Sequence, residues 1–267
     1  MNTRIRKLIH PLLSRAALKS QPFQVIQENE PIAEPNKPVI YAVNHSAFPD
    51  GPVMSAVVPK WALLLAGRQS LDFSGKLFFL LNGTLWVDRQ DKADMRRAKD
   101  QIIQRLRGGN DLIWFPEATW NVTESELMLP MRWGIIDAAR KANAQIIPTV
   151  LHYDRERMDV HIRWGPAMDG KQLVDKAAGI RDLRDTLATM RWEFWERNGT
   201  VSRQELNIAS CRSELKAIID EYLPLNADNE QAVIFRPYPL QETVFAAINK
   251  IQPNIENAFL FRKDIHN

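Results

Sequence analysis

The sequence predicts an α/β protein with a layered, largely parallel sheet flanked by helices. Two observations support this fold class. Short apolar runs of strand length alternate with segments of helix length from residue 39 onward, and turn residues such as Gly and Pro separate them. Hydrophobic residues make up 45% and charged residues 25% of the 267-residue chain, which excludes wholesale disorder and leaves ample material for a core.

The predicted strands are short apolar runs, most of them uninterrupted, as is usual for buried parallel strands. In chain order they are Val39–Val43, Trp61–Ala66, Thr84–Val87, Asp111–Phe115, Gln145–Leu151 and Arg157–Trp164. The segments between and after them have helix length, and the long charged one ends at a Gly-Gly-Asn turn. The predicted helices are Gly51–Val58, Ser74–Asn82, Lys92–Arg107, Met131–Ala142 and Ile180–Arg197.

Three parts of the chain differ in composition. Residues 1–27 form a basic leader, residues 28–200 a folded body that opens with a proline-rich connector, and residues 201–267 a C-terminal extension. A helix is expected over Arg203–Glu221 in the extension, whose role the sequence does not indicate. The one cysteine, Cys211, excludes a disulfide framework. No apolar run approaches the roughly 18 residues needed to span a bilayer.

The whole excess of positive charge in the protein lies in the leader. The formal net charge is +3, but residues 1–27 contain five of the 35 Lys/Arg residues and no acid, which leaves 30 basic and 32 acidic residues elsewhere, a net charge of −2. A nucleic-acid-binding body is therefore disfavoured. The leader's apolar residues recur at helical spacing, as in a basic amphipathic helix on an anionic membrane, although Pro11 would kink it. The alternative is a helix that packs on the protein's own core.

The first candidate site follows the predicted strand Val39–Val43, at the strand end where open α/β sheets bind ligands. His45 and Asp50 stand five residues apart there, and Pro49 favours a strand–turn–helix elbow in which the two side chains meet. A histidine oriented by a carboxylate is typical of a general base. The alternative is a loop histidine beside an Asp that serves the helix N-terminus.

Three other groups of polar residues also follow predicted strands. The segment after Gly83 runs into Asp88-Arg89, where the arginine can hold a phosphate or carboxylate, or only pair with Asp88. Glu117 and Thr119 leave their strand at a proline-fixed turn, so their hydrogen-bonding groups are expected over the same edge of the sheet. A proline in the fourth segment, Ile147-Pro148-Thr149, marks a strand edge or a bulge.

In this order, the four groups resemble the sequence blocks of the glycerolipid acyltransferase family, the lysophosphatidic acid acyltransferase type. The first block, N-H-x-x-x-x-D, matches at Asn44, His45 and Asp50. The second, G-x-x-x-x-D/N-R, matches at Gly83, Asp88 and Arg89. The third, F-P-E-G-T-R-S, matches at Phe115, Pro116, Glu117 and Thr119, and the fourth, V/I-P-V/T, at Ile147, Pro148 and Thr149. The resemblance covers roughly residues 25–200.

The resemblance implies transfer of an acyl group from a thioester, acyl-CoA or acyl-carrier protein, to a hydroxyl of a lysolipid. It gives His45 the role of general base and Asp50 that of its orienting carboxylate. Arg89 would face an anionic group of the acceptor, and Glu117 and Thr119 would line the acceptor site. Asn44, Gly83, Asp88 and Trp120 complete the expected substrate-binding set. The histidines are scattered without ligand spacing, so neither a metal nor a further cofactor is expected.

Two residues depart from the family pattern in the third block. Ala118 stands where the family has a glycine, which would give the turn freedom for positive φ. Trp120 stands where the family has an arginine that helps to surround the acceptor's phosphate. The indole removes charge and fills space, which predicts a phosphate-poor acceptor or one with a larger apolar or sugar group.

Because a lipid substrate resides at a membrane, it favours the interpretation of the leader as an anchor on an anionic membrane surface. We therefore expect a protein that is attached peripherally to the cytoplasmic face of a membrane. Two other functions stay open. The altered third block could belong to a non-catalytic, lipid-binding member of the family, although the intact pair of His45 and Asp50 argues against it. The same base could also act on water, as in a thioesterase or lipid hydrolase.

Overall fold

The computed structural model describes residues 3–20, 22–47, 49–68, 73–89, 91–121, 127–154 and 157–198, with positions 207–209, 213, 216 and 217. The chain divides into two compact units, Met1–Phe235 and Arg236–Asn267, and every described residue belongs to the first. The predicted helix over Arg203–Glu221 lies largely outside the described residues, as does Cys211.

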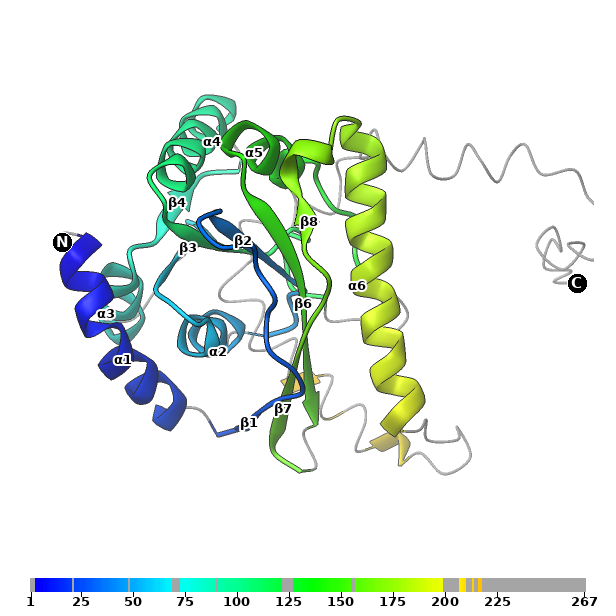
Figure 1. The fold of residues 1–267 in the computed structure, drawn as a ribbon. Helices are drawn as coiled ribbons and strands as arrows, with labels where there is room; N and C mark the ends of the chain where they lie inside the picture. The colour runs from blue at the N-terminus through cyan, green and yellow to red at the C-terminus, as the bar shows by residue number, and fades with distance from the viewer. Residues whose placement is uncertain are drawn as a thin grey trace, which may run out of the picture. The chain divides into compact units, whose positions relative to one another are not determined.

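The described residues form one mixed sheet in the order β1-β7-β6-β2-β5-β3-β4, with β8 paired to β6 (Figure 1). The strands are β1 (Gln24–Gln27), β2 (Val39–Val43), β3 (Ala62–Gly67), β4 (Leu85–Val87), β5 (Asp111–Trp114), β6 (Gln145–Asp154), β7 (Asp159–Trp164) and β8 (Met168–Asp169). The contiguous run β6-β2-β5-β3-β4 is parallel, whereas β7 and β8 pair antiparallel with β6. The predicted α/β class and largely parallel sheet are therefore confirmed.

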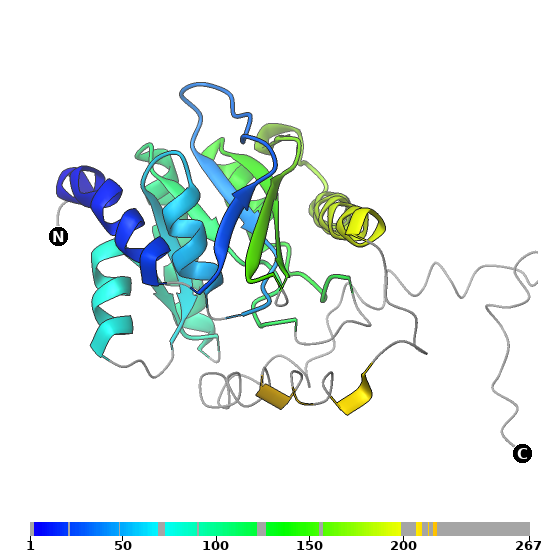
Figure 2. The ribbon, with the colours of Figure 1, turned by 90° about the horizontal axis from the view of Figure 1, so that it is seen from below.

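Helices cover both faces of this sheet. They are α1 (Thr3–Ser20), α2 (Asp50–Val57), α3 (Phe73–Asn82), α4 (Lys92–Arg107), α5 (Gly134–Ala142) and α6 (Lys176–Asn198), with a short 3₁₀ helix η1 (Gly170–Gln172). Figures 1 and 2 show α1, α2 and α3 on one face and α4, α5 and α6 on the other. The chain moves from β2 outward to β3 and β4, and then returns through β5 to β6. This reversal at the centre of the sheet is a switch point, where α/β proteins bind ligands.

The core lies around β2, whose five residues are all buried. Ile40 pairs with Leu112 of β5 on one side and with Ile146 of β6 on the other, and all three are at most 1% exposed. Burial on both faces explains the uninterrupted apolar sequence of this strand. It also gives β2 a fixed position from which to present the residues that follow Val43.

The segment 1–27, predicted as one helix, is two elements. The helix α1 ends at Ser20, and β1 joins the edge of the sheet in parallel with β7. The sequence analysis missed β1 because Gln-Val-Ile-Gln offers only two apolar residues. The helix runs from Thr3 through Pro11 to Ser20, so the proline lies inside the helix and does not end it.

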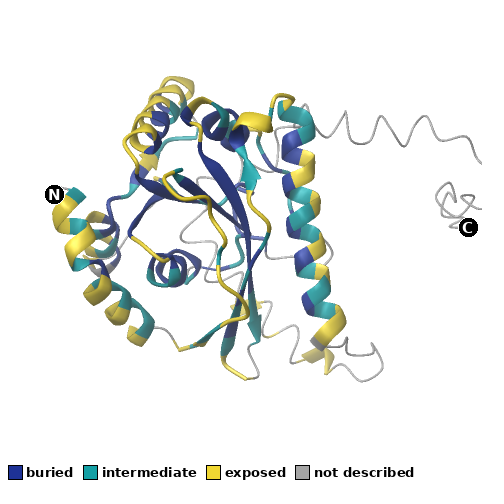
Figure 3. Ribbon diagram, viewed as in Figure 1, coloured by how far each residue is buried: buried dark blue, intermediate teal, exposed yellow. Residues whose placement is uncertain are grey.

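One side of α1 packs on the body, against α2 and α3. His10 is buried on this side, and the Arg6 guanidinium donates to the Leu80 carbonyl at 3.1 Å. The opposite side exposes apolar residues to solvent (Figure 3): Leu8 is 79% and Leu12 67% exposed. The helix therefore packs on its own protein and still presents an apolar row.

Candidate active site

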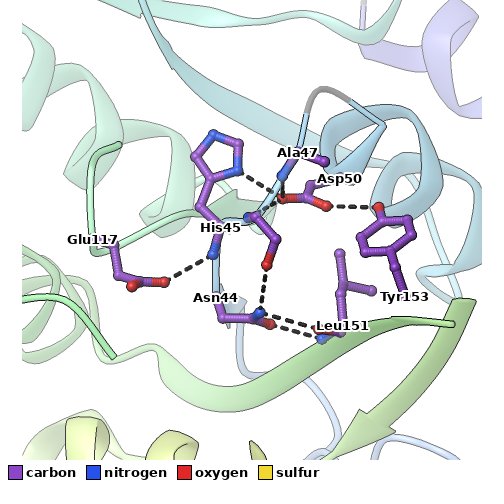
Figure 4. Close-up of polar contacts among 8 residues, drawn as sticks. Asn44, His45, Ala47, Asp50, Glu117, Leu151 and Tyr153 are labelled. Carbon is purple, nitrogen blue, oxygen red and sulfur yellow. Dashed lines mark hydrogen bonds and ion pairs between the residues drawn. The ribbon is translucent and has the colours of Figure 1, made fainter. Parts of the chain in front are cut away.

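The polar residues of the first and third sequence blocks meet at the carboxyl ends of β2 and β5. These strands are neighbours in the sheet, and β6 flanks β2 on its other side. Residues that follow β2 and β5, together with the part of β6 that extends past the end of β2, are therefore brought to one edge, although they are far apart in the sequence. Figure 4 shows the resulting cluster around His45.

His45 and Asp50 form the expected pair. Their side chains meet because the chain turns after β2 and α2 begins at Asp50, directly after Pro49. The His45 Nδ1 atom lies 2.8 Å from Asp50 Oδ2, and the Asp50 side chain is fully buried. The backbone N–H groups of Ser46 and Ala47 also donate to Oδ2, at 2.6 and 3.0 Å. Three contacts on one oxygen hold the Asp50 carboxyl in place, and this oxygen can accept from the Nδ1–H tautomer of the imidazole.

Aromatic rings fix the plane of the imidazole. The His45 ring stacks on Phe115 with centroids 4.2 Å apart, and the Trp120 indole meets it edge-on at 6.0 Å. The side chain of His45 is 18% exposed, and its second ring nitrogen points away from Asp50 (Figure 4). A nitrogen of this kind, with its tautomer fixed by a carboxylate on the other side, can accept a proton.

Glu117 anchors the backbone of this site. Its Oε1 atom accepts from the His45 N–H and its Oε2 atom from the Leu129 N–H, both at 2.8 Å. Glu117 is only 1% exposed, and this burial raises the pKa of its carboxyl to about 7 although the two N–H donors act in the opposite direction. Both of its oxygens are thus bonded to the backbone, and the expectation that Glu117 lines the acceptor site stays a prediction.

The other residues of the third block are buried beside this carboxyl. Thr119 is 7% and Trp120 6% exposed, and the Asn121 N–H donates to the His45 carbonyl at 2.6 Å. The backbone of His45 is therefore held on both of its polar groups, by Glu117 at the N–H and by Asn121 at the carbonyl. Asn121 was not among the predicted site residues, since its contribution is a backbone contact.

Ala118 has the backbone conformation that the family's glycine would favour. Its φ is +65°, in the left-handed region that L-residues other than Gly, Asn and Asp rarely occupy. The guanidinium of Arg89 donates to the Ala118 carbonyl and lies against Gly67 at the end of β3. Arg89 thus reaches from the edge strand β4 back to the turn of the third block.

Gly83 and Asp88 flank the edge strand β4. Gly83 precedes β4, at the opposite end of that strand from Arg89, with φ +79° and the Arg6 guanidinium against it. The positive φ at this position favours glycine, and the substrate-binding role given to Gly83 stays a prediction. Asp88 follows β4, and its N–H donates to Asp94 Oδ2 at 2.7 Å.

The sequence analysis missed one side chain of the cluster, that of Tyr153. Its hydroxyl donates to Asp50 Oδ1 at 2.6 Å (Figure 4). Asn44, predicted as a substrate-binding residue, forms two hydrogen bonds with the backbone of Leu151, at 2.7 and 3.1 Å. These bonds continue the pairing of β2 with β6 beyond the last residue of β2.

Neither a cluster of metal ligands nor a membrane-spanning helix occurs in the part of the chain that the structure describes. No group of three or more His, Cys, Asp or Glu side chains is placed to hold a metal ion there. Among the same residues, no helix combines the length and apolar character needed to cross a membrane.

The sequence of this chain is similar to those of known acyltransferases. A family model described as Acyltransferase matches residues 24–152. The chain is 27% identical over 135 residues to a lyso-ornithine lipid O-acyltransferase of Pseudomonas aeruginosa, covering 51% of this chain and 50% of the relative. It is 27% identical over 129 residues to a 1-acyl-sn-glycerol-3-phosphate acyltransferase of Neisseria gonorrhoeae, covering 48% of this chain and 49% of that protein. The chain thus spans about half the length of the curated relatives it matches.

A solved structure shares the fold. The crystal structure of the 1-acyl-sn-glycerophosphate (LPA) acyltransferase PlsC from Thermotoga maritima matches with a TM-score of 0.60 and 15% identity, over 76% of this chain and 86% of that one. The region matched by the family model contains β1 to β5 and most of β6, with His45, Asp50 and the third block, and it ends one residue before Tyr153. Residues 24–152 of this chain are thus similar to the acyltransferase family.

Proposed function

We propose that the protein is an O-acyltransferase that moves a fatty acyl group from a thioester donor, acyl-CoA or acyl-carrier protein, to a hydroxyl of a lysolipid. The observation that carries the proposal is the pairing of His45 with the buried Asp50 at 2.8 Å, with the second ring nitrogen directed away from the carboxylate. Such a pair is suited to take a proton from a hydroxyl.

In the proposed reaction, the acceptor hydroxyl attacks the thioester carbonyl while His45 Nε2 takes its proton. Asp50 holds the ring and stabilises the imidazolium that forms. The tetrahedral intermediate then collapses, its C–S bond breaks, and the imidazolium returns the proton to the departing thiolate. The products are an ester and a free thiol, so atoms and charges balance without a covalent acyl-enzyme.

The acceptor is proposed to be a phosphate-poor lysolipid. Trp120 stands where the resemblance expects an arginine, and its indole lies against the His45 ring with centroids 6.0 Å apart. This side chain adds bulk and no positive charge beside the base. The guanidinium of Arg89 is engaged with the Ala118 carbonyl. The relative from Pseudomonas aeruginosa, named for a lyso-ornithine lipid, supports an acceptor whose headgroup is an amino acid.

The protein is further proposed to attach peripherally to an anionic membrane at its cytoplasmic face. Ile5, Leu8 and Leu12 are exposed on α1 at spacings of three and four residues, and Arg4, Arg15 and Lys19 are exposed on the same helix. Phe73, Leu77 and Leu80 are exposed at the same kind of spacing on α3, which contacts α1. Apolar rows beside basic residues are the pattern of helices that lie in an anionic interface.

The catalytic proposal is tested with purified protein and a labelled palmitoyl thioester, supplied as CoA or as acyl-carrier protein. Three parallel reactions contain lyso-ornithine lipid, lysophosphatidate or no acceptor. We expect a labelled diacyl lipid that depends on the acceptor, and faster product formation with lyso-ornithine lipid. Release of free palmitate at the same rate in all three reactions would show a hydrolase, and no turnover in any reaction would favour a non-catalytic protein.

The membrane proposal is tested by co-sedimentation with vesicles of phosphatidylglycerol or phosphatidylcholine. The variant Leu8→Glu/Leu12→Glu changes the exposed row and leaves the packed side of α1 intact. It should bind phosphatidylglycerol vesicles about tenfold more weakly or worse, since two leucines are removed from the interface and two negative charges are added. Val174→Glu is the control, because Val174 is 71% exposed outside these helices. Equal binding by both variants would exclude α1 as the attachment surface.

A further inference from the structure

The hydroxyl of Tyr153 lies 2.6 Å from Asp50 Oδ1, on the side of the carboxyl that His45 does not use. We infer that Tyr153 is a positioning residue, which fixes the Asp50 carboxylate so that it holds the His45 ring in the orientation required of a base. This inference rests on the proposed acyl transfer for its kinetic consequence. The geometric part concerns three side chains of this protein and can be tested without turnover.

Tyr153 lies beside Asp50 because of its position in the sheet. β6 continues through Asp154, whereas β2 ends at Val43, so β6 extends past its neighbour. The amide of Asn44 holds this extension through its two bonds to the Leu151 backbone, at 2.7 and 3.1 Å. Side chains two residues apart lie on the same side of a strand, so Tyr153 projects on the same side of β6 as Leu151. On its other flank, the Tyr153 ring packs edge-on against Phe23 at 5.0 Å.

The two oxygens of Asp50 have separate partners. Oδ2 accepts from His45 Nδ1 and from the backbone N–H groups of Ser46 and Ala47. Oδ1 accepts from Tyr153. Bonds to both oxygens prevent the carboxyl group from rotating about its Cβ–Cγ bond, and a hydroxyl bonded to a carboxylate is among the stronger hydrogen bonds in proteins. Loss of the hydroxyl leaves a fully buried oxygen without this donor, and the carboxyl plane that orients His45 is then less constrained.

Tyr153 touches Asp50 and acts through it, so its removal should affect the chemical step more than binding. We expect Tyr153→Phe to lower kcat about tenfold, as judged from the strength of a hydrogen bond to a charged group, and to leave KM for the acceptor unchanged. This substitution keeps the ring and its packing on Phe23. The matched control is Phe23→Leu, which disturbs that packing and keeps the hydroxyl. A purely structural role for Tyr153 would give the two variants similar effects.

The effect of Tyr153 on the orientation of the His45 ring is measured by ¹⁵N NMR of that ring in the protein without substrates. The variant His45→Gln assigns the ring signals. The wild type and Phe23→Leu should both show the Nδ1–H tautomer, which a carboxylate on Nδ1 selects. Tyr153→Phe should show a larger share of the Nε2–H tautomer. In an Asp50→Asn background, adding Tyr153→Phe should produce little further change, because the hydroxyl acts through the carboxylate.

The results separate the inference from the proposed function. If the wild type transfers no acyl group but Tyr153→Phe shifts the His45 ring signals, acyl transfer is wrong and the positioning role holds. If the wild type is active and Tyr153→Phe retains its kcat and its ring signals, Tyr153 does not position the pair. Additive changes of the ring signals in the Asp50→Asn background would also overturn the inference. A thermal melt of each variant confirms that a lost signal does not reflect unfolding.

Discussion

Glu117 offers a direct test of how burial and hydrogen bonding compete at this site. Its carboxyl is 1% exposed and accepts two backbone N–H groups, from His45 and Leu129. Burial raises its pKa from 4.5 to about 7. The folded protein therefore binds this proton more tightly than the unfolded chain does. It follows that the free energy of unfolding should fall as the pH rises through the interval from 4.5 to 7.

The structure gives the size of this effect. A change of pKa from 4.5 to about 7 corresponds to about 3 kcal/mol of unfolding free energy, present at low pH and lost by pH 8. Glu117→Gln removes the titration. The amide keeps one acceptor for two N–H groups, which costs about 1–3 kcal/mol at every pH. The variant should therefore be less stable than the wild type at pH 4.5, and the difference should close or reverse by pH 8.

Urea denaturation of both proteins at pH 4.5, 6 and 8 measures the difference. All other titrating groups are shared by the two proteins, so their contributions cancel in the comparison. A difference in unfolding free energy that stays constant with pH would refute the reasoning, since it would mean that Glu117 has the same pKa in the folded and unfolded chain.

Four further substitutions test other local statements. Ala118→Gly relieves a φ of +65° and should raise the free energy of unfolding by about 0.5–1 kcal/mol in urea denaturation; no gain would mean that the alanine is unstrained. Trp120→Arg should increase turnover of lysophosphatidate in the labelled-thioester assay, and unchanged turnover would contradict the role given to the indole. Gly170→Ala would bring a Cβ against the Ala144 carbonyl oxygen and should lower the free energy of unfolding by about 2 kcal/mol or more. Gly109→Ala would meet no atom within 4 Å, so it should lower the free energy of unfolding only by the strain of its φ of +75°. Equal losses for these two glycines, measured by the same denaturation, would contradict the packing argument.

Much of the fold could be predicted because its signals are local. Val39–Val43 is apolar throughout, and it forms the buried strand β2 over the same residues. The His45 and Asp50 pair could also be predicted, since both residues belong to one turn whose course Pro49 restricts. The strand β1 was missed, because its place in the sheet depends on pairing with β7, more than 130 residues away.

The site residues that sequence reasoning missed or could not place depend on tertiary register. Tyr153 reaches Asp50 only because β6 runs past the end of β2, which a single sequence does not reveal. Gly83 stands six residues before Arg89, but the strand β4 separates them and places the glycine at the opposite edge. Glu117 was expected among the acceptor contacts, and its direction toward the backbone of His45 follows from the pairing of β2 with β5.

The central claim is that His45 acts as the base of an acyl transfer, and His45→Ala tests it most directly. The measurement is the initial rate of acceptor-dependent diacyl lipid formation from a labelled palmitoyl thioester, by wild type and variant at equal concentration and with matched thermal melts. Loss of a positioned general base predicts a rate lower by a factor of about 10²–10⁴. A variant that remains folded and forms the product at the wild-type rate would contradict the account.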